Sequence, residues 1–216
     1  MGLFKMIFGK PSKSSAKKSS TASKEAPKSI AQIRREMAAE DARFNRIMGE
    51  VNDAVDALGN SSDHDKAIAH YRMTIEKARA ADINLSTSHD FRLVNEYIKV
   101  GRFNDAWAYL NELTMKHPED LSKIRKEQCR IRKKEKKWID ALQFLMMSHA
   151  SRYGGFNREA FLKDLKPIAS RIPLVDDEPE YLADMLSGLS GEPYYRDGAA
   201  ASLFRGFYKD HLSGRG

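Results

Sequence analysis

The sequence STSHDFRLVNEYIKVGRFNDAWAYLNELTMKHPED, residues 86–120, decides the fold of this chain. Its apolar and small residues follow in the order Leu93, Tyr97, Gly101, Phe103, Ala106, Leu110, Leu113 and Pro118. A helix–turn–helix unit of about 34 residues needs that order, with apolar anchors on the first helix, a small residue in the turn and a proline at the close. Residues 87–120 are therefore predicted to form one helical hairpin.

Part of this pattern recurs on both sides of the hairpin. Three segments place an alanine four residues before a large apolar residue, in the pairs Ala67 and Tyr71, Ala106 and Leu110, and Ala141 and Leu145. The intervals between these alanines, 39 and 35 residues, lie close to the period of such hairpins. With no convincing run of strands, the chain is predicted to be all-α, with a long helix, about three hairpins and a C-terminal helical cap.

With these residues, the stretch 87–120 resembles a tetratricopeptide repeat, and a weaker likeness covers roughly residues 48–150. The resemblance implies a helical-hairpin α-solenoid whose first helices line a concave groove for peptides. In the matched unit, the implied groove residues are Phe91, Arg92, Asn95, Ile98 and Lys99. In the next unit they are Lys126, Arg130 and Lys133, which share one helix face.

The chain also departs from the family pattern. Asn95 matches the asparagine with which the family grips carboxylates, but the basic residue expected four places earlier is Phe91. Asp90 stands near the start of the repeat, where the family carries tryptophan. A degenerate array and a related helical-repeat fold both remain open, and the expected ligand is an acidic protein segment rather than a terminal carboxylate.

The net charge is distributed unevenly along the chain. Of the net charge of +7 over 216 residues, the first 30 residues carry +6, from seven lysines and Glu25. We expect a disordered basic tail over residues 1–29, a long helix with hairpins over 30–155, and the C-terminal cap over 156–216.

Four apolar residues near the N-terminus lie on one face at helical spacing, namely Leu3, Phe4, Ile7 and Phe8. They could enter the acyl boundary of an anionic membrane while the lysines of residues 1–28 meet its headgroups. A free terminus is the alternative. No apolar run reaches the length of a membrane span, so the location expected is cytoplasmic, with or without peripheral membrane contact.

A single apolar stripe runs along the predicted helix from residue 30 to residue 58. It alternates steps of three and four and is apolar at eight of nine positions, with Glu40 as the exception. Such a stripe is typical of a coiled-coil seam or of a helix packed along a helical body. Packing against the hairpins is favoured, and a homodimer through residues 30–58 stays open.

Residues 123–137 contain nine basic and two acidic side chains. Like charges one turn apart on a helix repel, so a partner that neutralises them would remove a cost. Three interpretations of this basic run remain: a solvated helix face, a site for an acidic protein segment, and, third, a nucleic-acid contact. No recognised nucleic-acid-binding signature is present in the sequence.

Evidence for catalysis is poor. The six histidines show no metal-ligand spacing, and no glycine-rich phosphate loop is present. Cys129, the only cysteine, has no histidine near it in sequence, which favours an ordinary thiol over a nucleophile. We therefore expect a non-catalytic adaptor for protein partners without cofactor or metal. The alternatives are a membrane-tethered protein and a nucleic-acid-associated protein.

Overall fold

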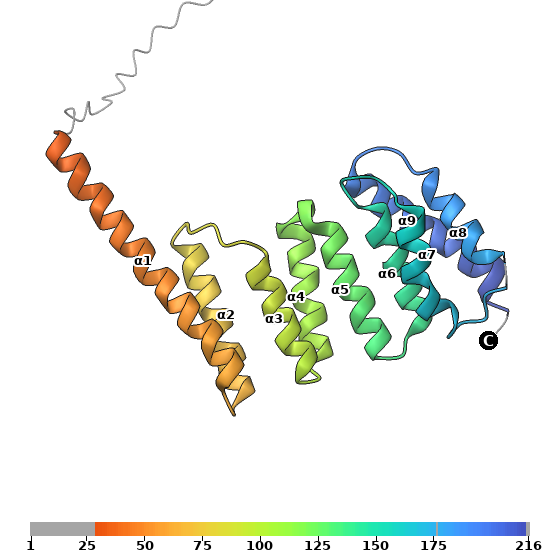
Figure 1. The fold of residues 1–216 in the computed structure, drawn as a ribbon, viewed down its shortest axis with the longest axis horizontal. Coiled ribbons are helices and arrows are strands. Elements are labelled where there is room, and N and C mark those ends of the chain that lie inside the picture. The colour runs from red at the N-terminus through yellow and green to blue at the C-terminus, as the bar shows by residue number, and fades with distance from the viewer. Residues whose placement is uncertain (1–28, 176, 215–216) are drawn as a thin grey trace, which may run out of the picture. The chain divides into compact units, whose positions relative to one another are not determined.

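The computed structural model describes residues 29–175 and 177–214, and their regular structure is entirely helical (Figure 1). The α-helices are α1 Ile30–Asn60, α2 His64–Ala80, α3 Ser88–Lys99, α4 Phe103–Lys116, α5 Leu121–Lys134, α6 Trp138–Ala150, α7 Arg158–Ala169, α8 Glu178–Ser187 and α9 Pro193–Phe207. A 3-10 turn, Pro118–Asp120, precedes α5, and a π-helical turn, Tyr208–Leu212, follows α9. The predicted all-α class is confirmed.

The chain divides into two compact units, Met1–Arg43 and Phe44–Gly216. The divisions predicted from the sequence, after residues 29 and 155, stay predictions. In the first unit the structure describes only residues 29–43, which include the start of α1. The predictions made for residues 1–28, including membrane contact by Leu3, Phe4, Ile7 and Phe8, lie outside the described residues.

The hairpin predicted over 87–120 forms from α3 and α4. Gly101 adopts a left-handed φ of 77°, which glycine reaches without strain. The Gly101 N–H donates to the Ile98 carbonyl, and the Arg102 N–H donates to the Tyr97 carbonyl, at 2.8 Å. These two bonds form a Schellman motif, which satisfies the last carbonyls of α3 and turns the chain into α4.

The same turn closes α5, although no glycine is present. Lys136 has a φ of 61° and takes the place of Gly101, 35 residues further along the chain. The Lys136 N–H donates to the Lys133 carbonyl, and the Lys137 N–H donates to the Arg132 carbonyl. The two hairpins α3–α4 and α5–α6 therefore share one turn geometry, which accounts for the near-regular spacing of the sequence pattern.

In the second unit, each helix from α2 to α7 packs against the next along the chain, and α9 returns to contact α6 and α5. Figure 1 shows α2 to α5 side by side in this order. Buried side chains form two clusters, one from α1 to α4 and one from α6 to α9. The helix between them, α5, contributes Ile124 and Ile131 to the first cluster and Cys129 to the second.

The apolar stripe of α1 is buried along only part of its length. Its later members, Ile47, Val51, Ala54 and Leu58, lie in the first cluster, as expected for packing against the hairpins. Its earlier members are exposed, with Ile30 at 72%, Ile33 at 43%, Met37 at 58% and Phe44 at 50%. One continuous sequence pattern thus includes both a buried and an exposed part of α1.

A buried carboxylate links α2, α3 and α4. Asp90, at the start of α3, is fully buried. Its Oδ2 accepts a hydrogen bond from Arg79 of α2, and its Oδ1 accepts one from the Tyr109 hydroxyl of α4, each at 2.5 Å. Because both partners depend on this carboxylate, it sets how α2 and α4 meet α3.

Removal of the buried carboxylate should therefore destabilise the fold. We expect Asp90→Ala to lower the free energy of unfolding by about 3 kcal/mol, since it leaves Tyr109 and much of Arg79 unpaired. Asp105→Ala removes a partly exposed carboxylate that pairs with Arg102 at 2.6 Å, and should cost less than about 1 kcal/mol. Urea unfolding measures both values, and similar losses in the two variants would contradict the role given to Asp90.

Candidate functional site

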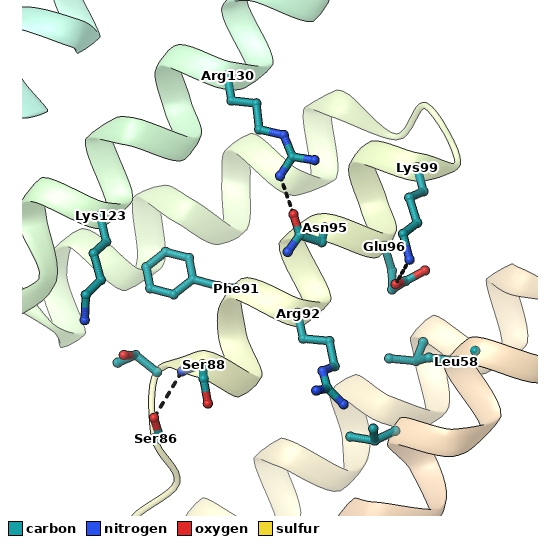
Figure 2. A pocket seen from close by; sticks show the side chains of 13 residues that line it. Leu58, Ser86, Ser88, Phe91, Arg92, Asn95, Glu96, Lys99, Lys123 and Arg130 are labelled. Carbon is teal, nitrogen blue, oxygen red and sulfur yellow. Dashed lines mark hydrogen bonds and ion pairs between the residues drawn. The ribbon is translucent and has the colours of Figure 1, made fainter. Parts of the chain in front are cut away.

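A hollow of about 870 Å³ opens beside α3, and most of the residues predicted for the groove line it (Figure 2). Phe91, Arg92, Asn95 and Lys99 come from α3. Arg130 reaches the same hollow from α5. The end of α1 and the loop before α3 complete the wall.

A second hollow, of about 790 Å³, lies between α5 and α7. Lys126, Arg130 and Lys133 of α5 all line it, together with residues from the end of α6 and the loop that follows. Lys123 and Arg130 line both hollows, so the two adjoin along α5. The structure therefore brings seven of the eight predicted groove residues to two adjoining hollows.

One expected groove residue faces elsewhere. Ile98 is buried in the first apolar cluster and lines neither hollow. Val94 precedes it by one helical turn and is also buried there, so the two share the inner face of α3. The prediction for Ile98 was wrong because an apolar residue on this face contributes more by joining the core.

A contact between α3 and α5 lies where the two hollows adjoin, since Arg130 lines both. The Arg130 guanidinium donates to Asn95 Oδ1 and to Glu127 Oε2, the latter at 3.1 Å. Figure 2 shows the arginine side chain extending from α5 to Asn95 on α3. Asn95 Oδ1 thus already accepts a bond within the chain, whereas its amide nitrogen makes no hydrogen bond within the described residues and can donate to a ligand.

The basic residues of the hollows fall into two groups. Lys99 pairs with Glu96 and Lys123 pairs with Asp120, each at 2.6 Å. Within residues 29–175 and 177–214, four others form no ion pair, namely Arg92, Lys126, Lys133 and Arg152. Across the two hollows seven basic side chains stand against five carboxylates, so the excess of positive charge is two; the carboxylates are Glu96, Glu119, Asp120, Glu127 and Asp164. Arg152, which follows α6, was not predicted, since no sequence pattern marks it.

The basic run 123–137 does not form a single solvated face. Arg125 points into the body, where its guanidinium contacts the Asp197 carboxylate of α9 at 2.8 Å. Arg132 stacks over the Trp107 ring, with its guanidinium carbon 3.8 Å from the ring centre. The sequence missed Asp197 because it lies 72 residues from its partner.

Three potentially reactive side chains also line the second hollow: Cys129, His149 and Asp164. His149 Nε2 lies 3.2 Å from Asp164 Oδ2, and burial lowers the pKa of His149. Burial raises the pKa of the Cys129 thiol to about 11, although Lys133 and Lys126 oppose this shift. The thiol is therefore protonated at neutral pH, which does not suit a nucleophile.

The part of the chain that the structure describes contains no cluster of three His, Cys, Asp or Glu side chains arranged to hold a metal ion. In the same residues, no helix combines the length and apolar character needed to cross a bilayer. Comparisons of the chain with models of protein families, with curated proteins and with solved structures find no match.

The environment of Cys129 predicts an unreactive thiol. A pKa of about 11 lowers the thiolate fraction at neutral pH roughly 100-fold relative to a thiol of pKa 9, and burial also blocks access. We expect Cys129 to react with iodoacetamide at least about 100-fold more slowly in the folded chain than in guanidinium. Met115→Cys adds an exposed thiol as an internal reference, and mass spectrometry separates the two sites. Equal alkylation rates at the two sites would contradict this prediction.

The burial of His149 predicts a loss of stability in mild acid. Its pKa in the folded chain lies below the ordinary value of 6.5, so the unfolded chain binds more protons between the two values. The free energy of unfolding should therefore fall as the pH drops below about 6.5. His149→Phe should reduce this fall, and His70→Ala, which removes an exposed histidine, should leave it unchanged. Urea unfolding at several pH values tests both expectations, and an equal fall in all three proteins would contradict them.

Proposed function

We propose that this protein is a non-catalytic adaptor that binds an acidic protein segment along the two adjoining hollows. In this proposal the hairpins α3–α4 and α5–α6 belong to a degenerate tetratricopeptide-like array, and their first helices form the binding face. The shared turn geometry at Gly101 and Lys136 supports the array. The location of the predicted binding residues on α3 and α5 supports the binding face.

The observation that carries the proposal is the pair Lys126 and Lys133 on α5. They stand two helical turns apart, line the same hollow, and form no ion pair within the described residues. Arg130 lies between them but pairs with Glu127 at 3.1 Å, so the two lysines are the unpaired cations among the described residues on this side of the helix. An acidic chain that lies across these cations reduces the repulsion between them. The concave wall excludes water and so strengthens the attraction between the cations and the acidic chain.

The hollows also favour a segment with some apolar side chains. Phe91 and Leu58 line the first hollow, and Leu145 lines the second. The amide nitrogen of Asn95 can donate to a main-chain carbonyl of the bound segment. A segment that alternates acidic and apolar residues would therefore place its carboxylates against the cations and its apolar side chains against these walls.

Binding of labelled acidic peptides to the purified chain tests the proposal. The peptides should be about ten residues long, because a fully extended chain of that length spans roughly 35 Å. We expect Lys126→Glu with Lys133→Glu to weaken binding at least about tenfold, measured by fluorescence anisotropy at two salt concentrations. The matched control is Lys134→Glu with Lys136→Glu, which makes the same charge change at exposed positions that line neither hollow.

The outcomes separate the proposal from its alternatives. Binding that weakens only in the Lys126 and Lys133 variant supports the groove. An equal loss in both double variants would show attraction to net charge alone and would overturn the proposal. A single-stranded oligonucleotide titrated in parallel provides the third arm: tighter binding to it than to any peptide, with a steep salt dependence, would favour nucleic acid.

A further inference from the structure

The exposed part of the α1 stripe presents a row of apolar side chains at the surface. Ile33, Met37 and Phe44 lie on one face of α1, and each side chain is at least 43% exposed. Isolated apolar residues are common on protein surfaces, but these three continue the heptad positions of Ile47 and Val51, which are buried. We propose that this segment of α1 forms an antiparallel two-stranded coiled coil with α1 of a second copy of the chain.

The heptad positions restrict the register to a few choices, and the charged residues beside the seam select one of them. In an antiparallel pair, the a positions of one helix face the d positions of the other. Phe44 then faces Ile33 of the second copy, and Met37 faces Glu40 of the second copy. The seam stops at Ile47, because from there α1 packs into its own chain. The contact is short and symmetric about its centre, between residues 38 and 39.

Charged residues beside the stripe determine the direction. In the antiparallel register, Arg34 lies beside Asp41 of the second copy, and Glu36 lies beside Arg43. Symmetry repeats both contacts, so four attractive pairs flank the seam. A parallel pair would place Glu36 against Asp41 twice and Glu40 against Glu40. The flanking charges therefore favour only the antiparallel arrangement.

Sedimentation equilibrium of the full chain tests the association. Concentrations from about 1 to 500 µM are needed, because a small interface dimerises weakly. Glu40 is the one charged residue on the seam, so Glu40→Leu should lower the dimer dissociation constant at least about tenfold. A chain that stays monomeric throughout, with or without this substitution, would overturn the proposal.

Charge reversal provides a matched set of variants. Arg34→Asp turns two attractive contacts into repulsive ones and should weaken the dimer about tenfold. Adding Asp41→Arg to the same chain recreates both pairs and should restore the affinity. Arg35→Asp makes the same charge change on the outward face of α1 and should have little effect. Weakening by Arg35→Asp equal to that by Arg34→Asp would argue against specific pairing.

Cysteine cross-linking fixes the direction. Ile33→Cys with Phe44→Cys should form disulfides between two chains on oxidation, since the two positions lie about 16 Å apart along one helix and cannot bond within it. Either cysteine alone should not cross-link, and Arg35→Cys with Ala42→Cys is the outward-facing control. Efficient cross-linking of Ile33→Cys alone would show a parallel pair. If the chain is monomeric and binds anionic vesicles, and Met37→Asp abolishes this binding, the stripe belongs to a membrane-binding surface. Either this result or the parallel cross-link would overturn the proposal.

Discussion

The ion pair between Arg125 and Asp197 fixes the helix on which both hollows depend. Arg125 also donates to Gln128 Oε1 at 2.8 Å, and the Gln128 amide donates to Asn111 of α4 at 2.9 Å. This network links α4, α5 and α9 through side chains that lie largely inside the body. A buried pair of this kind adds little net stability, because dehydration of both charges offsets their attraction. Loss of one partner is costly, however, so the pair strongly restricts how α5 can rotate.

The orientation of α5 determines which of its basic residues point into the body and which line the second hollow. Ile124 and Ile131 anchor one side of the helix in the first core, and Cys129 enters the second. With these sides held, Lys126 and Lys133 must face the second hollow. The charges that looked like one run in the sequence therefore perform different tasks. Arg125 and Arg132 hold the structure together, whereas Lys126 and Lys133 give the surface its charge.

The local features of the fold were predictable from the sequence, and the long-range ones were not. The order of residues around Gly101 indicated the α3–α4 hairpin, because glycine at a left-handed turn and apolar spacing are local signals. Lys136 performs the same role without glycine and gave no such signal. The α1 stripe has one period throughout, so no local pattern could separate its buried part, from Ile47, from its exposed part. That division depends on which neighbours the rest of the chain supplies.

The two proposed surfaces reinforce each other thermodynamically. In the two proposals, four cations and a few apolar contacts would give one groove a modest affinity for a short acidic segment, and the short α1 seam would give a weak dimer. A partner with two acidic segments could occupy the grooves of both chains, so that its second contact forms at high effective concentration. Such a partner would bind the proposed dimer more tightly than the monomer and would therefore also stabilise the seam. Two weak interfaces on one chain can in this way select multivalent partners over single acidic peptides.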